Sequence, residues 1–140
     1  MSERLLAIVE GMHIRPDDQV LEIGCGHGVA ASFICERLRR GHLVAIDKSK
    51  KMIAAALQRN EEHVRSGKAE FHVVDVLDFD PRKRKFDKIL AVRVGLLHRN
   101  PALVSSHLDK WLAPRGKVFV VYDEPSGSGA RRSTRAHARR

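Results

Sequence analysis

The sequence has few cysteines, few aromatic residues and no long apolar run. Its two cysteines, Cys25 and Cys35, are too few for the disulfide framework of a small secreted protein. We therefore expect a reducing compartment and a cytoplasmic location. The charged N-terminal residues and the absence of about 18 consecutive apolar residues argue against a signal peptide and a membrane span. Aromatic residues make up 5% of the chain, so it offers no platform on which nucleic-acid bases would stack.

Length and composition predict one globular domain followed by a tail. The chain has 140 residues, 43% of them hydrophobic and 31% charged, which suffices for one hydrophobic core. We place the domain at residues 1–123. Residues 124–140 are rich in Gly and Ser and carry five arginines against one glutamate, so we expect a basic, disordered tail. The net charge of +9 leaves open a weak contact of this tail with nucleic acid.

Short apolar runs alternate with helical patterns along the domain. We expect strands near residues 20–23, 43–46, 71–74, 86–92 and 117–122. Helices are expected over about 2–12, from Gly28 to about 40, from the N-cap Ser49 to before Gly67, and after Asn100-Pro101. Residues 78–85 look like a loop. Strands rich in Val, Ile and Leu that alternate with helices predict a parallel, doubly wound α/β sheet with helices on both faces, a three-layer αβα sandwich.

The turn after the first strand contains three glycines at alternate positions, Gly24, Gly26 and Gly28. Such a turn lets the backbone approach a ligand closely, and the following helix offers free N–H groups. A dinucleotide-binding loop needs its third glycine at position 29, which is Val29, and a phosphate-binding P-loop needs a Lys-Ser/Thr pair that is absent. A nicotinamide enzyme is therefore disfavoured.

The stretch Val20-Leu21-Glu22-Ile23-Gly24-Cys25-Gly26-His27-Gly28 resembles the first motif of class I S-adenosylmethionine-dependent methyltransferases, an acid followed by Gly-x-Gly-x-Gly. The likeness continues at Asp47, at Asp75-Val76, and at Leu112-Ala113-Pro114-Arg115-Gly116, which is similar to the family's Leu-x-Pro-Gly-Gly with Arg115 in place of a glycine. It runs from about Leu5 to Tyr122. The resemblance implies the strand order 3-2-1-4-5, here without the family's usual sixth and seventh strands.

The resemblance also implies a cofactor, S-adenosylmethionine, with S-adenosylhomocysteine as the product. Asp47 is expected to bind both ribose hydroxyls, Asp75 and the Val76 amide to bind the adenine, and Lys48 or Met52 to contact its face. The backbone of Ala91 or Val92 is expected near the methionine amine. The implied cofactor-binding set is Glu22, Gly24, Cys25, Gly26, Gly28, Asp47, Lys48, Met52, Asp75, Val76, Ala91 and Val92.

The acceptor end of the site is less defined by the sequence. Family members often place acceptor contacts after the fourth strand, where His98 is a candidate base and Arg93 a candidate partner for an anionic acceptor. No Asn-Pro-Pro-Tyr type signature is present, so amide and adenine nitrogens are disfavoured as acceptors. The histidines show no metal-ligand spacing with the cysteines, so no metal is expected. A small-molecule acceptor is favoured over nucleic acid. The alternative is a non-catalytic S-adenosylmethionine-binding protein or partner subunit of the same fold.

The fifth predicted strand, Val118 to Tyr122, is apolar and has no obvious neighbour on its outer side. Proteins normally cover such an edge, because unpaired backbone groups invite association. We expect either a homodimer through this strand or coverage by the tail.

Overall fold

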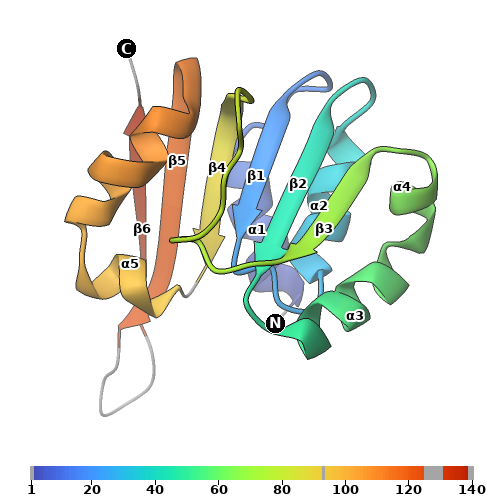
Figure 1. Ribbon diagram of the computed structural model, residues 1–140, viewed down its shortest axis with the longest axis horizontal. Helices are drawn as coiled ribbons and strands as arrows, with labels where there is room; N and C mark the ends of the chain where they lie inside the picture. Colours follow the sequence, from blue (N-terminus) through green and yellow to red (C-terminus); the bar gives the residue numbers. More distant parts are fainter. Residues whose placement is uncertain (1, 93, 125–130, 139–140) are drawn as a thin grey trace.

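A six-stranded sheet with the order β3-β2-β1-β4-β5-β6 organises the chain (Figure 1). The structure, a computed structural model, describes residues 2–92, 94–124 and 131–138, with the backbone alone at 96, 98, 104, 105, 122–124 and 131–138. The strands are Gln19–Ile23 (β1), His42–Asp47 (β2), Ala69–Val73 (β3), Phe86–Val92 (β4), Leu112–Glu124 (β5) and Arg131–Ala138 (β6). The first five run parallel in the order predicted from the resemblance, 3-2-1-4-5, which is confirmed.

Helices cover both faces of the sheet, as the α/β pattern predicted. They are Ser2–Gly11 (α1), Val29–Arg37 (α2), Lys50–Arg59 (α3), Glu61–Arg65 (α4) and Gly95–Arg99 (α5), followed by a π turn, Val104–Leu108, and a 3-10 turn, Asp109–Trp111. Figure 1 shows α1 and α2 behind the sheet and α5 in front of it, near β5. No helix in the described part of the chain is long and apolar enough to cross a bilayer.

The two faces of the sheet bury separate sets of alternating side chains. Val20, Leu43 and Phe71 pack with α1, α2 and α3 on one face. Leu21 and Val44 pack on the other face with α5, the turns that follow it and the connection from β3 to β4. Burial on both sides explains why the strands read as nearly continuous apolar runs.

The predicted helix after Ser49 begins where expected. The Ser49 hydroxyl accepts a hydrogen bond from the Met52 amide at 3.2 Å, which caps α3. The helical stretch ends before Gly67 but is divided at Asn60. The connection from β3 to β4 contains no helix, as predicted, and its Phe79 ring packs edge to face against Trp111 with centroids 5.3 Å apart.

The helix predicted after Asn100-Pro101 is present, and a short helix that was not predicted, α5, precedes it. The chain becomes helical at Gly95, and Asn100-Pro101 interrupts it before a second helical stretch. The Leu103 amide donates to the Asn100 carbonyl at 3.0 Å, so these two residues start the second stretch and not the first. The fifth strand also begins earlier than predicted. It starts at Leu112, with a register shift opposite Phe86 and Lys88 that accommodates Arg115 at φ 68°.

The prediction of a disordered tail is wrong for residues 131–138. They form β6, which pairs antiparallel with β5 from Lys117 opposite Ala138 to Glu124 opposite Arg131. The low strand propensity of this segment is outweighed by the backbone hydrogen bonds that the open edge of β5 offers. Of the two expectations for that edge, the structure shows coverage by the chain's own tail. Residues 125–130, 139 and 140 lie outside the described residues.

Candidate cofactor site

A cavity of about 490 Å³ lies at the end of the sheet where the parallel strands finish. Its volume is in the range typical of small-molecule sites, and this end is where doubly wound sheets bind ligands. Its walls come from α1, the loops that follow β1 and β2, the segment after β3, and the segment that joins β4 to α5. The strand order thus brings together residues that lie far apart in the sequence.

The glycine loop after β1 forms one wall of this cavity. The Gly24 and Cys25 amides both donate to the Ile46 carbonyl, at 2.9 and 3.0 Å, which fixes the loop to the end of β2. Gly24 has φ 75°, and a Cβ there would lie 2.8 Å from Val94 Cγ2. Gly26 has φ 55°, but a Cβ there would meet no atom within 4 Å. The space above Gly26 is therefore open to a ligand.

The third glycine of the motif has a different place from the one expected. Gly28 does not line the cavity. It has φ 87°, and a Cβ there would lie 2.6 Å from Asn60 Nδ2 and 3.0 Å from the Ala56 Cα. Asn60 is buried, and its Nδ2 donates to the Gly28 carbonyl at 3.1 Å and to the Ala56 carbonyl at 3.0 Å. In this structure Gly28 allows α2 to pack against α3.

Asp47, at the end of β2, joins the two loops of the site. Its Oδ2 accepts a hydrogen bond from the Gly26 amide at 2.9 Å, and its Oδ1 accepts one from the Ser49 amide at 2.8 Å. A carboxylate has about four lone-pair positions, so each oxygen retains one for a ligand hydroxyl. The side chain is partly exposed in the cavity wall, which suits the ribose-binding role predicted for it.

Glu22 is a carboxyl group that is buried in the cavity wall. Its side chain is 2% exposed, and its Oε1 has no hydrogen-bond partner among the described residues. Burial, together with the negative charge of Asp47, raises the pKa of Glu22 to about 8. A buried polar atom without a partner is uncommon in folded proteins, and here it belongs to a residue that lines the cavity.

Asp75 and Val76 lie on the far side of the cavity, after β3. Asp75 Oδ1 accepts from the Leu77 amide at 3.0 Å, a local turn that holds the carboxylate in place. The Val76 amide donates to no acceptor among the described residues, and both residues line the cavity. Their positions are consistent with the predicted contacts to an adenine.

Most of the predicted cofactor residues meet in this one cavity. Those that line it are Glu22, Gly24, Cys25, Gly26, Asp47, Lys48, Asp75, Val76 and Val92. Gly28, Met52 and Ala91 do not line it: Met52 is 38% exposed on α3, and Ala91 is fully buried in β4. The cofactor contacts expected of these three residues stay predictions.

Several cavity residues were missed by the sequence reasoning. They are Leu5, Ile23, His27, Val29, Ala30, Ile46, Val74, Val94, Gly95 and Arg99. His27 and Val29 adjoin the motif, so a wider window would have found them. Leu5 and Arg99 reach the cavity through packing between distant segments, for which the sequence has no local signal.

The cysteine thiols are poorly suited to nucleophilic chemistry. Burial, together with the charges of Glu22 and Asp47, raises the pKa of Cys25, and burial also raises the pKa of Cys35, to about 12. The candidate Arg93 and the side chain of the candidate His98 lie outside the described residues. No cluster of His, Cys, Asp and Glu in the described part of the chain is placed to hold a metal ion.

Residues 20–116 match the family model described as a methyltransferase domain. The chain belongs to this family. The suspected membership of the class I methyltransferases, which use S-adenosylmethionine, is thereby confirmed, and their solved structures share its fold.

Curated relatives and solved structures agree with the family. Phosphoethanolamine N-methyltransferase 1 of Arabidopsis thaliana is 37% identical over 114 residues, which are 80% of this chain and 22% of the relative. Putative methyltransferase YrhH of Bacillus subtilis is 23% identical over 86% of this chain and 66% of its own. One similar solved structure is coclaurine N-methyltransferase bound to N-methylheliamine and S-adenosylhomocysteine. The match covers 87% of the present chain and 36% of coclaurine N-methyltransferase, with a TM-score of 0.73 and 17% identity. The chain thus spans about a fifth of the plant relative that it resembles.

Proposed function

We propose that this member of the methyltransferase family binds S-adenosylmethionine and transfers its methyl group to a small molecule. The observation that carries the proposal is that Glu22, whose Oε1 has no partner among the described residues, lines the same cavity as the open glycine loop at Gly26. A cationic ligand in the cavity would offset the cost of burying a negative charge on Glu22. Asp47 and Asp75 line the same cavity, so its carboxyl groups are suited to a sulfonium compound that carries hydroxyl and amino donors.

The chain's own part in the reaction is to bind and align. When bound, S-adenosylmethionine supplies a methyl group on a positively charged sulfur. Displacement at that carbon depends on alignment and proximity, which lower a barrier by about 7–11 kcal/mol. Asp47 is proposed to hold the ribose, Asp75 and the Val76 amide to hold the adenine, and the glycine loop to hold the methionine part close to β1. These assignments are supported by the common cavity.

The acceptor is proposed to be an amine nitrogen of a small molecule. The relatives support this choice, since they include N-methyltransferases named for phosphoethanolamine and for tetrahydroprotoberberine. O-phosphoethanolamine and ethanolamine are therefore the first pair of acceptors to test.

Calorimetric titration with S-adenosylmethionine, S-adenosylhomocysteine and NAD tests cofactor binding. We expect both adenosyl compounds to bind and NAD not to bind, and the reverse result would contradict the proposal. Methyl transfer is then followed with methyl-labelled cofactor. Asp47→Ala should abolish most turnover at limiting cofactor, whereas Asp17→Asn removes an exposed charge before β1 and should leave it unchanged.

A non-catalytic binding protein is the second candidate. The structure of the [4+2]-cyclase SpnF matches 89% of this chain with a TM-score of 0.73 at 22% identity, so this fold also serves other chemistry. Tight cofactor binding without methyl transfer to any amine of the panel would favour this candidate.

A further inference from the structure

The carboxyl groups of the cavity gather on one side, together with Lys48, and Arg99 lies on the other side. Glu22 and Asp47 end β1 and β2, and Asp75 follows β3. On the opposite side of β1, the segment after β4 contributes Arg99. Since β3 and β4 are separated by three strand spacings, about 14 Å, Arg99 lies well apart from the proposed adenine contacts.

Arg99 is directed back toward the start of its own helix. It is the last residue of α5, one turn after Gly95, and both residues line the cavity. A Cβ on Gly95 would lie 2.8 Å from Arg99 Nη1, so the glycine leaves the room that the guanidinium uses. Arg99 is exposed, and no carboxylate in the described part of the chain pairs with it. Its charge is thus available to a ligand.

The carboxylate of the cofactor has other donors within the same cavity. His27, just before α2, and Val29 and Ala30, in its first turn, line it, and their amides donate to no acceptor among the described residues. Amides at a helix start are suited to a carboxylate. This arrangement leaves the guanidinium of Arg99 for the second substrate.

We propose that Arg99 binds an anionic group, a phosphate monoester, on the acceptor and makes the enzyme selective for phosphorylated over unphosphorylated amines. The inference rests on the proposed function and specifies its acceptor class. A guanidinium binds phosphate oxygens with two parallel hydrogen bonds, which an ammonium group does not match. The net charge of +9 would also favour the approach of an anion.

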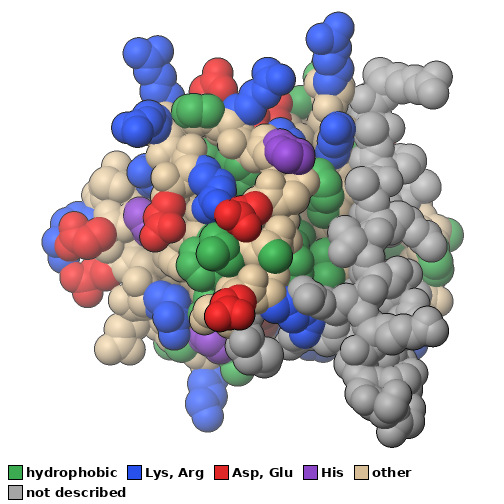
Figure 2. Space-filling model, turned by 180° about the vertical axis from the view of Figure 1, so that it is seen from behind, with side chains coloured by type: hydrophobic (Ala, Val, Ile, Leu, Met, Phe, Trp, Pro, Cys, Tyr) green, Lys and Arg blue, Asp and Glu red, His purple; other side chains and the backbone are tan. Residues whose placement is uncertain are grey.

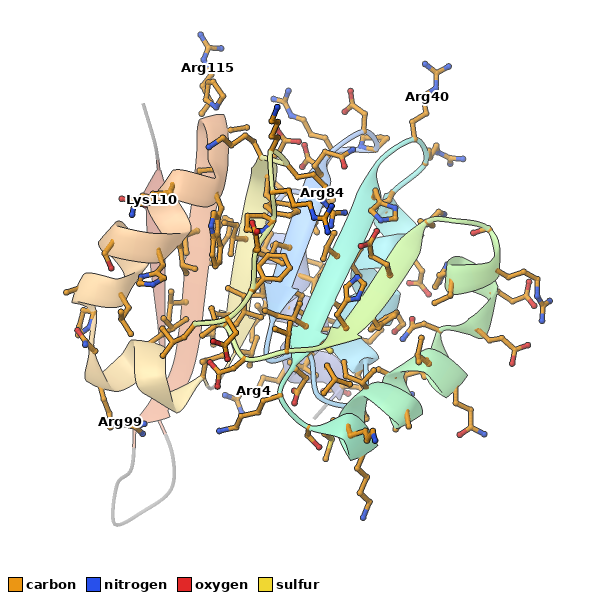
Figure 3. The ribbon with its side chains drawn as sticks, in the orientation of Figure 1. Arg4, Arg40, Arg84, Arg99, Lys110 and Arg115 are labelled. Carbon is orange, nitrogen blue, oxygen red and sulfur yellow. The ribbon has the colours of Figure 1, made fainter. Side chains whose placement is uncertain are left out.

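The chain offers a matched control for the charge of Arg99. Figure 3 shows Arg99 at the end of the sheet where the strands finish and Arg40 at the opposite end. Arg40 is exposed in the loop before β2 and has no contact with the cavity. Figure 2 shows several other basic side chains along that far rim. Arg40→Gln therefore changes the net charge equally without touching the site.

The test is calorimetric binding of the phosphorylated and unphosphorylated amines of the preceding subsection to the protein loaded with S-adenosylhomocysteine. We expect the phosphorylated amine to bind at least tenfold more tightly than the unphosphorylated one. Arg99→Gln should weaken its binding by about ten- to a hundredfold, the loss expected for a charge-assisted pair. It should not weaken binding of the unphosphorylated amine, and Arg40→Gln should change neither.

A second variant tests the position of the guanidinium without removing it. Gly95→Ala places a methyl 2.8 Å from Nη1, so the guanidinium has to shift. Gly95 has no left-handed backbone, so the helix should tolerate the change. We expect this variant to weaken binding of the phosphorylated amine more than binding of the unphosphorylated one. Equal affinity for the two amines, no binding of either, or an unchanged affinity in Arg99→Gln would overturn the inference while cofactor binding persists. Failure of S-adenosylhomocysteine to bind would overturn the proposed function and this inference with it.

Discussion

The Gly26 amide donates a hydrogen bond to Asp47 Oδ2 at 2.9 Å, across 21 positions of the sequence. This bond ties the glycine loop after β1 to the carboxylate that ends β2. The loop is thus shaped by the acid that we propose as the ribose contact. Cofactor binding and local order of the loop should therefore depend on the same side chain.

Replacing Asp47 by alanine tests this dependence. We expect Asp47→Ala to weaken binding of S-adenosylmethionine by about 1–3 kcal/mol, since the hydrogen bonds to the ribose and the support of Gly26 are both lost. Adenosine alone should show the same loss and methionine a smaller one, as measured by calorimetry. Unchanged adenosine affinity would remove Asp47 from the proposed nucleoside contacts.

The raised pKa of Glu22 predicts a pH-dependent stability. With a folded pKa of about 8 against the ordinary 4.5, the native state holds more protons than the unfolded chain between these values. The free energy of unfolding should therefore fall as pH rises from about 4.5 to about 8. Glu22→Gln removes the ionisable group, so its advantage over the natural protein should grow across that window in urea unfolding. Parallel pH profiles of the two proteins would contradict the raised pKa.

Gly28 and Gly67 form a matched pair for the packing of α2 on α3. Both have a left-handed backbone, with φ 87° and 82°. A Cβ on Gly28 would clash with Asn60 and Ala56, whereas one on Gly67 would meet no atom within 4 Å. Gly67→Ala should cost about 1–2 kcal/mol for its backbone conformation, and Gly28→Ala about 1–3 kcal/mol more for overpacking. Urea unfolding measures both, and equal losses would argue against the close contact with Asn60.

Removal of residues 125–140 should expose the outer edge of β5. That edge pairs with β6 from Lys117 to Glu124, and its unpaired backbone groups would become a template for another chain. We expect the truncated protein to self-associate in sedimentation velocity at micromolar concentrations and the full chain to remain monomeric. A truncated protein that stays monomeric would show that this edge needs no cover.

The strand pattern and the motif residues were predictable because they are local. Apolar runs such as residues 43–46 favour strands that are buried on both faces, and the motif acid and its glycines are read from one continuous stretch of sequence. Once the family resemblance set the strand order, the meeting of Glu22, Asp47 and Asp75 at one end followed from the parallel sheet.

The remaining features depended on contacts between distant segments. The role of Gly28 was decided by Asn60, the strand formed by residues 131–138 by the open edge of β5, and the place of Arg99 by the direction of α5. None of these features has a periodic signal in the sequence, because each arises from packing between residues that are far apart in the chain. The sequence by itself determined the layers and the carboxyl groups of the cavity, whereas the tertiary structure decided the place of Arg99 and the last strand.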